Sequence, residues 1–372
     1  MKLNVYFLSL VLLILNSCND CSKSTAPMTR VSFDLSRAKQ MNLSEFVDSI
    51  SLVLLETNDY SLLKSVQALN VTDSLFIVED KGVMLSFNKR GDFLFSTCSL
   101  QGEGPHDYYS GMDFTLLPEG NIEVFDAVRC KLLSYNKEFQ YVSTYKLPKD
   151  ILPVSGYLYL SDDYRLFINK NELKLFSVSE NKIVDMYEEL GIPHFNIFNK
   201  NGFQVKGNSI FVSTKHQNYY YELIVDKKKL ELRAICEFDF GDEANLDLAD
   251  FPKGKDERFY LKYFDNNPRK SYVTDKYVDD ERNMCFFIYD NKSYFAYQNR
   301  RMGINQVYYN EISTQEQFMP ANFYKNGVFY YVSEPLYLQF LVDKSLMSLE
   351  DINKIELIRE DDNPVIICYK LK

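Results

Sequence analysis

The stretch that decides the fold runs from Leu75 to Phe95 and reads LFIVEDKGVMLSFNKRGDFLF. It contains three short apolar runs, Leu75–Val78, Met84–Phe87 and Phe93–Phe95, and the polar turn Asn88–Asp92 joins the last two. Short apolar runs joined by polar turns are typical of antiparallel hairpins. The stretch therefore predicts a small sheet of short β-strands.

The same kind of strand recurs along the chain at a nearly constant interval. After Leu75, the recurring strands begin at Ile122, Leu166, Ile210, Cys285 and Val328. Their starts are separated by 47, 44, 44, 75 and 43 residues. A four-stranded propeller blade repeats about every 40–50 residues. We therefore predict an all-β fold, a six-bladed β-propeller with four-stranded antiparallel blades.

A ring of blades has to be closed, because open sheet edges are prone to aggregation. Ile50–Leu55 and Val365–Tyr369 are strand-like, and each is expected to complete one blade with strands from the opposite end of the chain. The propeller is predicted to span residues 31–372, with an insertion at about 242–270 between blades 4 and 5. A ring of five or seven blades is one alternative. A pair of β-sandwiches is another, but it would not explain the regular spacing.

The N-terminus predicts export. Lys2 precedes an apolar run from Val5 to Leu15, which is shorter than the roughly 20 residues of a membrane-spanning helix and fits a signal peptide. The run ends in Leu15-Asn16-Ser17-Cys18, which resembles a bacterial lipobox. We predict a lipoprotein signal peptide at 1–17, lipidation at Cys18, a polar tether at 18–30, and a lipid-anchored location in the cell envelope, on the periplasmic side or the cell surface. An ordinary signal peptide with an accidental Cys, or an uncleaved anchor, is the alternative.

The amino-acid composition excludes some classes of binding partner. The chain has 42 basic and 52 acidic residues and a net charge of −10, which argues against binding to nucleic acid. The same charge would be repelled by anionic lipid headgroups, so we expect membrane contact through the N-terminal lipid only. The 28 Tyr and 28 Phe residues favour β-structure, and the lack of Trp excludes the signatures of WD repeats and of sialidase Asp boxes.

Several stretches resemble the six-bladed β-propeller lipoprotein family of Bacteroidetes, whose repeats are NHL-like. Ile50–Thr57 is similar to its first strand, which ends in Leu-Glu-Thr, and Gly102–Tyr108 is similar to its Gly-x-Gly-Pro-Gly-Glu-Tyr turn. Phe238–Gly241 and Asn363–Val365 match further positions. The resemblance implies a propeller fold and an envelope location, but no particular reaction.

Three groups of residues are candidate sites. The first is the turn with His106, Asp107, Tyr108 and Tyr109, which is expected on a face of the ring beside the channel as a ligand site, or else is a tight connection between blades. Tyr220 is a candidate stacking platform, with core packing as the alternative. The insertion carries the aromatics Phe259, Tyr260, Tyr263 and Phe264, which are expected to contact a partner or else to cover the underside of the ring.

No motif in the sequence predicts catalysis. His106, His194 and His216 lie in different repeat units, and neither a Gly-x-Ser-x-Gly elbow nor a P-loop occurs. We therefore expect no cofactor and no metal site, with Ca²⁺ or Zn²⁺ in the channel as the alternative. The predicted function is a lipid-anchored binding or scaffold propeller that recognises an envelope protein, a peptide or a glycan through its face or central channel. A metal-assisted lyase or hydrolase of the NHL-like type, and a structural component of a nutrient-uptake system, are the alternatives.

Overall fold

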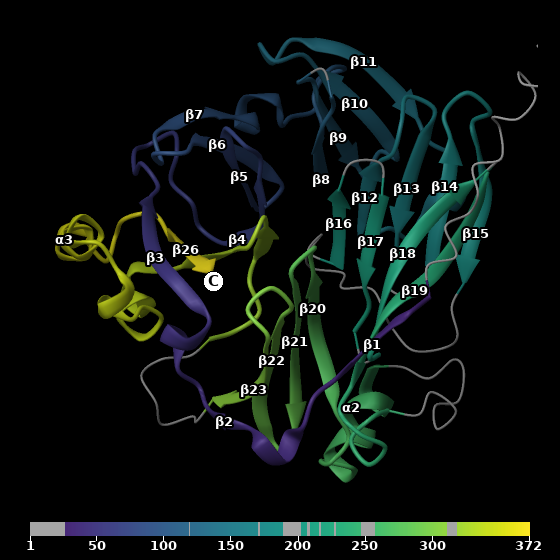
Figure 1. Cartoon of the computed structure of the whole chain (residues 1–372). Coiled ribbons are helices and arrows are strands. Elements are labelled where there is room, and N and C mark those ends of the chain that lie inside the picture. Colours follow the sequence, from purple (N-terminus) through teal and green to yellow (C-terminus); the bar gives the residue numbers. More distant parts are fainter. Residues whose placement is uncertain are drawn as a thin grey trace, which may run out of the picture.

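The computed structural model describes residues 27–118, 120–169, 172–188, 202–206, 209–215, 217–226, 228–246, 257–310 and 318–372. These residues form six antiparallel sheets arranged in a ring, and the fold is a six-bladed β-propeller (Figure 1). The predicted fold class is therefore confirmed. Cys18, His194 and His216 lie outside the described residues.

Each blade has four antiparallel strands, ordered from the centre of the ring outward. Blade 1 is β4 (Val66–Val71), β5 (Leu75–Asp80), β6 (Val83–Asn88) and β7 (Phe93–Ser96), and blade 2 is β8 (Gly111–Leu116), β9 (Ile122–Asp126), β10 (Lys131–Tyr135) and β11 (Tyr141–Lys146). Blade 3 is β12 (Gly156–Tyr159), β13 (Tyr164–Ile168), β14 (Glu172–Ser177) and β15 (Lys182–Glu188), and blade 4 is β16 (Phe203–Lys206), β17 (Ser209–Ser213), β18 (Tyr219–Asp226) and β19 (Lys229–Asp239). Blade 5 is β20 (Tyr272–Val278), β21 (Arg282–Tyr289), β22 (Lys292–Asn299) and β23 (Ile304–Asn310), and blade 6 is β24 (Phe323–Lys325), β25 (Val328–Ser333), β26 (Val365–Leu371) and β3 (Val47–Leu54). The recurring strands of the sequence are the second strands of the blades.

The ring is closed within blade 6. There β26 pairs antiparallel with β3, so that Ile366 faces Val53 and Ile367 faces Leu52. The two terminal strands therefore share one blade, and the predicted closure of the ring by strands from both ends of the chain is confirmed. The reason is that β24 and β25 leave this blade two strands short, and β26 and β3 fill both positions.

The segment before β3 runs along the outside of two further blades. Strand β1 (Thr29–Ser32) pairs in parallel with β19, and β2 (Lys39–Gln40) pairs in parallel with β23. Figure 1 shows this purple segment passing along the outer edges of blades 4 and 5 before it enters blade 6. The N-terminal part of the chain therefore holds three consecutive blades together, which the sequence analysis did not predict.

The carboxylate of Asp239 fixes β1 to blade 4. It accepts hydrogen bonds from Arg30 Nε at 3.1 Å and Ser32 Oγ at 2.8 Å, and also from Gly241 N and Asn245 Nδ2. Burial alone would raise the pKa of this carboxyl, but the hydrogen bonds outweigh burial and hold the pKa well below its usual range. The ionised form of Asp239 therefore stabilises the attachment of the N-terminal strand.

In the described part of the chain, each boundary between neighbouring blades holds one of six large apolar clusters. Tyr and Phe side chains fill much of this space. The fully buried ring of Phe46, for example, packs against Phe295, Tyr308 and Phe318 with centroid separations of 5.1 Å. Both faces of each blade are covered in this way, which explains the nearly continuous apolar runs in the second strands.

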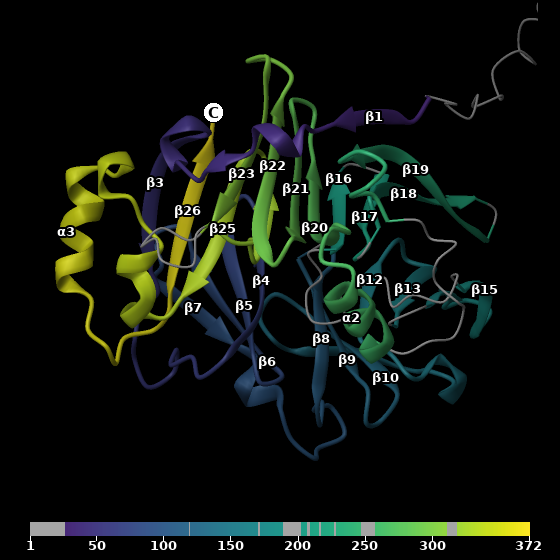
Figure 2. The same cartoon turned by 90° about the horizontal axis from the view of Figure 1, so that it is seen from below.

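Helices occur in the connections between strands. Helix α2 (Glu257–Asn266) lies between blades 4 and 5, and α3 (Leu349–Leu357) lies between β25 and β26. Figure 2 shows α3 at the outer edge of the ring beside β3. Short 3-10 helices complete the connections: η1 (Leu35–Arg37), η2 (Leu43–Glu45), η3 (Thr97–Leu100), η4 (Lys149–Ile151), η7 (Pro335–Phe340) and η8 (Lys344–Leu346).

Within the described residues no helix is long and apolar enough to cross a membrane. The described cysteines are all free thiols. Cys130, Cys236 and Cys285 are buried, whereas Cys98 is exposed.

Candidate functional site

The two faces of the ring carry different turns. In each blade the first strand ends and the second strand begins on one face of the ring, which we call the hairpin face. Each inner strand begins on the opposite face, which we call the connection face. Because the inner strands all run toward the hairpin face, their last residues meet there around the axis.

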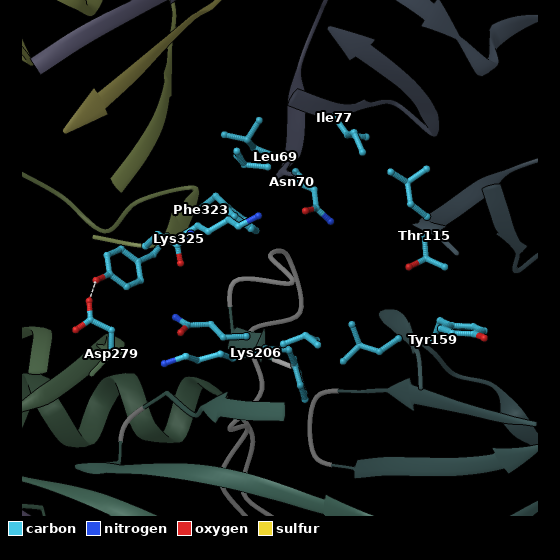
Figure 3. Close-up of a pocket in the computed structure, with 18 of the residues that line it drawn as sticks. Leu69, Asn70, Ile77, Thr115, Tyr159, Lys206, Asp279, Phe323 and Lys325 are labelled. Atoms are coloured by element: carbon cyan, nitrogen blue, oxygen red, sulfur yellow. Dashed lines mark hydrogen bonds between the residues drawn. The ribbon is translucent and has the colours of Figure 1, made fainter. Parts of the chain in front are cut away.

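A cavity of about 880 Å³ lies where the inner strands end. All six inner strands contribute to its wall (Figure 3). Residues from these strands that line it include Leu69, Asn70, Thr115, Tyr159, Gln204, Lys206, Phe323 and Lys325. The volume falls within the range of about 300–1,000 Å³ that is typical of ligand sites in proteins.

The wall of the cavity has two chemically different sides. Blades 4 to 6 supply six charged residues, namely Lys206, Asp279, Asp280, Glu281, Arg282 and Lys325. Among the residues that the structure describes, blades 1 to 3 supply one charged residue, Glu79, and a largely apolar wall that includes Leu69, Val71, Ile77, Met84, Leu116 and Leu158. In Figure 3, Leu69 and Ile77 lie on the opposite side of the cavity from Asp279 and Lys206. A guest that filled this cavity would contact apolar and charged surfaces at the same time.

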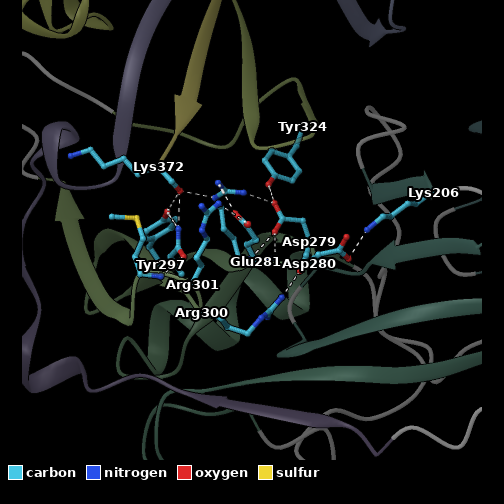
Figure 4. Close-up of polar contacts among 12 residues, drawn as sticks. Lys206, Asp279, Asp280, Glu281, Tyr297, Arg300, Arg301, Tyr324 and Lys372 are labelled. Carbon is cyan, nitrogen blue, oxygen red and sulfur yellow. Dashed lines mark hydrogen bonds and ion pairs between the residues drawn. The ribbon is translucent and has the colours of Figure 1, made fainter.

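Asp279 is the centre of a polar network between blades 5 and 6 (Figure 4). One carboxylate oxygen accepts from the backbone nitrogens of Glu281 and Arg282 at 2.7 and 2.6 Å. The other accepts from the Arg282 side chain at 3.1 Å and from the Tyr324 hydroxyl. Burial, followed by the charge of Asp279, raises the pKa of Tyr324, which keeps this hydroxyl protonated. The network makes this part of the rim rigid.

Two ion pairs at the rim join neighbouring blades. Lys206 Nζ lies 2.6 Å from Asp280, and the side chains are 59% and 86% exposed. Lys325 Nζ lies 2.7 Å from Asp73, and the side chains are 32% and 94% exposed. These pairs are open to water, unlike the network at Asp279.

A buried ion pair supports the opposite side of the cavity. The guanidinium of Arg165 binds both carboxylate oxygens of Glu123, at 2.7 and 2.9 Å, and both side chains are less than 10% exposed. The guanidinium carbon lies 4.4 Å from the ring centroid of Tyr159, which lines the cavity. The pair joins blade 2 to blade 3 and supports the ring of Tyr159 in the cavity wall.

Another buried charge joins blades 4 and 5. The ammonium group of Lys276 donates to the backbone oxygen of Gln217 at 2.7 Å and to that of Thr214. Burial lowers the pKa of Lys276 to about 8. Since its hydrogen bonds go to the main chain of the neighbouring blade, the role of this lysine is structural.

The predicted residue Tyr220 lies in the core between blades 4 and 5, where it is 1% exposed. Its hydroxyl donates to Gln204 Oε1 at 3.1 Å, and Gln204 lines the cavity. The Nε2 of Gln204 is buried and has no hydrogen-bond partner within the described part of the chain. Tyr220 therefore supports the cavity wall from behind, which agrees with the core-packing alternative.

The structure brings the predicted residues His106, Asp107, Tyr108 and Tyr109 together in the connection between blades 1 and 2. They are not among the residues that line the cavity. Tyr108 is fully buried, its hydroxyl lies 2.9 Å from Thr97 Oγ1, and burial raises its pKa to about 12. Tyr109 is 48% exposed. The ring of His106 lies 4.0 Å from that of Tyr141.

The position of the Asp107 side chain explains why this turn contains glycine at positions 102 and 104. The Oδ2 of Asp107 accepts from Gly104 N at 2.9 Å. A Cβ atom on Gly102 or Gly104 would lie 2.5 or 2.6 Å from the same oxygen, closer than real Cβ contacts allow. The turn is therefore built around the side chain of Asp107, and its role as a ligand site stays a prediction.

The described aromatic residues of the insertion pack near the start of β20, the inner strand of blade 5. Phe259, Tyr263 and Phe264 are partly buried and cluster with Leu246. The Phe264 ring contacts the ring of Tyr272, the first residue of β20, at 4.7 Å and nearly at a right angle. The side chain of Tyr260 lies outside the described part. A partner contact at these residues stays a prediction.

Within the described ranges no group of three or more His, Cys, Asp or Glu side chains is arranged to hold a metal ion.

The residues that line the cavity were not predicted from the sequence, although a signal was present. Each recurring strand follows a polar turn, and two of these turns contain Asp279–Arg282 and Lys325–Asn326. Since a turn before the second strand marks the end of the inner strand, these residues could have been placed near the axis.

Fold and site together define this protein as a six-bladed β-propeller with a cavity at one end of its channel. The chain belongs to the DUF4934 family, a domain of unknown function, whose model matches residues 29–370. No curated protein matches the chain.

The chain is similar to several solved structures. A protein from Bacteroides fragilis described as exported is 16% identical, with a TM-score of 0.67 over 92% of this chain and 100% of that one. A DUF4221 member from Bacteroides vulgatus is 10% identical, with a TM-score of 0.49 over 87% and 99% of the two chains. Virginiamycin B lyase from Staphylococcus aureus is 11% identical, with a TM-score of 0.36 over 71% and 74%. The first of these shares the propeller fold along its whole length.

Proposed function

We propose that this propeller is a binding module that holds a segment of polypeptide in the cavity at its hairpin face. The observation that carries the proposal is the mixed wall, which is largely apolar on blades 1 to 3 and combines charged side chains with apolar ones such as Val205 and Phe323 on blades 4 to 6. A polypeptide presents apolar side chains, charged side chains and main-chain hydrogen-bonding groups on neighbouring positions. It therefore matches such a wall better than a purely apolar or purely polar ligand does.

A peptide also fits the wall better than a glycan. The apolar side is mainly aliphatic, with Leu69, Ile77, Leu116 and Leu158. Sugar rings are bound preferentially by flat, exposed aromatic faces, and the Tyr159 ring is already stacked on the Arg165 guanidinium. Branched aliphatic side chains instead favour the burial of apolar groups of similar shape.

The cell envelope is the proposed location, with the domain held by a lipid at Cys18. The signal-peptide pattern and the lipobox support this, as does the exported relative from Bacteroides fragilis. In this setting the propeller would act as an anchored receptor or scaffold for another envelope protein. Cys18→Ala should move the protein from the membrane fraction to the soluble fraction, and unchanged fractionation would contradict lipid anchoring.

The binding proposal is tested with an array of short peptides that tile the envelope proteins of the source organism. The mature chain is compared with a variant whose cavity is filled, Val205→Trp. Val205 lies on the inner strand β16, lines the cavity and is 62% exposed, so the larger side chain enters open space. The control is Val142→Trp on the outer strand β11, where the valine is 51% exposed and does not line the cavity.

The expected result is a set of bound peptides that Val205→Trp loses by at least about tenfold in affinity, since its indole occupies the cavity. Val142→Trp should retain them. If no peptide binds, or if both variants bind as the parent does, the cavity is not a peptide site.

A further inference from the structure

The charged residues that line the cavity differ in how strongly they already interact with other groups of the protein. The carboxylate of Asp279 accepts four hydrogen bonds from its own turn and from Tyr324. Glu281 pairs with Arg282 at 3.4 Å and with Arg301 at 3.4 Å. The carboxylate of Asp279 is therefore held within the protein, and a guest would have to break a rigid network to reach it, whereas the carboxylate of Glu281 is 37% exposed and open to water.

The two lysines at the rim are held much more weakly. Lys206 and Lys325 pair with Asp280 and Asp73, which are 86% and 94% exposed. Ion pairs between such exposed groups contribute little, because water and salt screen them and both side chains lose conformational entropy. A carboxylate that arrives with a guest can displace either aspartate at low cost.

A third cation lies next to Lys325. Lys89 is in the turn between β6 and β7, and its ammonium lies 4.2 Å from the ring centroid of Phe76. Burial, and then the like charge of Lys325, lower the pKa of Lys89, while Asp73 raises it. Two cations that repel each other are stabilised when an anion binds beside them.

From these observations we propose that the guest in the cavity is an acidic segment of polypeptide with interspersed apolar residues. Its carboxylates would pair with Lys206 and Lys325, and its apolar side chains would contact the wall formed by blades 1 to 3. The inference rests on the proposed function and names the chemistry of the ligand.

The negative charge of the whole chain does not oppose this inference. At physiological salt, exposed charges separated by more than about 8 Å are largely screened. Within that distance Lys206 and Lys325 lie beside Asp280 and Asp73, so an acidic guest reaches the two lysines by displacing these aspartates, whereas the remaining surface slows its approach mainly at low salt. Binding should consequently weaken less steeply with added salt than it would for a cationic protein.

The test uses the full mature chain and three pools of synthetic peptides. All pools alternate random Leu, Val or Phe with one polar residue, which is Glu in the first pool, Gln in the second and Lys in the third. Binding is measured by fluorescence anisotropy for the parent, Lys206→Gln and Lys325→Gln. The matched control is Lys137→Gln, because Lys137 is also an exposed turn lysine paired with a carboxylate, at 3.8 Å from Glu138, and does not line the cavity.

We expect the Glu pool to bind most tightly. Lys206→Gln and Lys325→Gln should each weaken it by about threefold to tenfold, with no effect from Lys137→Gln. If the Gln or Lys pool binds equally well or better, the inference is wrong while the binding function stands. Equal binding of the Glu pool by all variants also overturns the inference. If no pool binds and the peptide array is blank as well, the proposed function fails together with it.

Discussion

The buried pair of Glu123 and Arg165 offers a sharp test of how the blades are held together. In Glu123→Gln the side chain keeps its shape, but the negative charge is lost and the new amide group places N–H donors against the donors of Arg165. The guanidinium stays buried at 7% exposure and without a counter-charge in this pair. Breaking a buried pair by removing one partner costs about 3–5 kcal/mol. We expect a loss of about 3 kcal/mol, because the remaining amide oxygen still accepts one hydrogen bond.

The loss is measured by urea unfolding followed by circular dichroism. For a slope of about 3 kcal/mol per M, the midpoint should fall by about 1 M. Glu138→Gln is the control, since Glu138 pairs with Lys137 at the surface, where the side chains are 57% and 75% exposed. This control should not shift the midpoint measurably.

The double variant Glu123→Leu with Arg165→Met removes both charges. It therefore separates the loss of stability caused by an unpaired buried charge from the contribution of the ion pair itself to stability. Replacing a buried ion pair by apolar groups of similar size is often nearly neutral. The double variant should therefore recover at least half of the stability that Glu123→Gln loses. If Glu123→Gln is no less stable than Glu138→Gln, or if the double variant is as unstable as the single one, the reasoning is refuted.

Four further substitutions test other contacts. Burial alone would raise the pKa of Asp239, but four hydrogen bonds lower it, so its stabilising effect is present above the unfolded pKa of about 3.9 and is lost as the pH falls. The Tm of Asp239→Asn should accordingly lie below that of the parent at pH 7, and the difference should shrink below about pH 4; a difference that is constant with pH would contradict the assignment. Gly91→Ala should cost roughly 3 kcal/mol or more in chemical unfolding, because its Cβ would lie 1.9 Å from the backbone oxygen of Leu54 at a φ of +93°. Gly303→Ala, at a φ of +67° and with open space around it, should cost only about 1 kcal/mol, and equal losses would show that the close approach to blade 6 does not matter. Asn363→Ala removes three side-chain hydrogen bonds that join blade 6 to the connection into blade 1, and should lower stability by about 2–4 kcal/mol in the same assay; an unchanged midpoint would mean that these bonds do not hold the ring closed.

The blades were predictable because their signal is local. Each second strand, such as Ile122–Asp126, is covered on both faces and therefore reads as an apolar run at every repeat. The hairpins follow from turn residues that lie next to these runs.

Strand β2 and helix α3 were not predicted, and their sequence signals differ in strength. The two-residue strand β2, Lys39–Gln40, is exposed and pairs with its neighbour through the main chain, so no side-chain pattern marks it. Helix α3 did carry a signal, since Ser348 caps it and Glu350 and Asp351 stand in its first turn, as in many helix N-termini. The N-terminus of α3 is therefore marked in the sequence by its cap and its acidic first turn.

The candidate site was less predictable than the fold. The turn at Gly102–Tyr108 was predicted as a ligand site because its motif is distinctive. Its glycines are explained by the fit around the side chain of Asp107. The residues at the cavity rim have ordinary turn sequences. Their common place appears only when the turns of six blades are brought to one axis.

The sequence by itself determined the repeat, the number of blades and the antiparallel hairpins, because these depend on contacts between residues close in the chain. The tertiary structure decided which side chains meet. Lys206 and Asp280 are 74 positions apart and Lys325 and Asp73 are 252 apart, yet each pair lies within hydrogen-bonding distance. Ring closure sets the distance of every inner strand from the axis and from strands far away in the sequence. Local patterns carry no information about that distance, and the two-sided cavity is therefore a property of the closed ring.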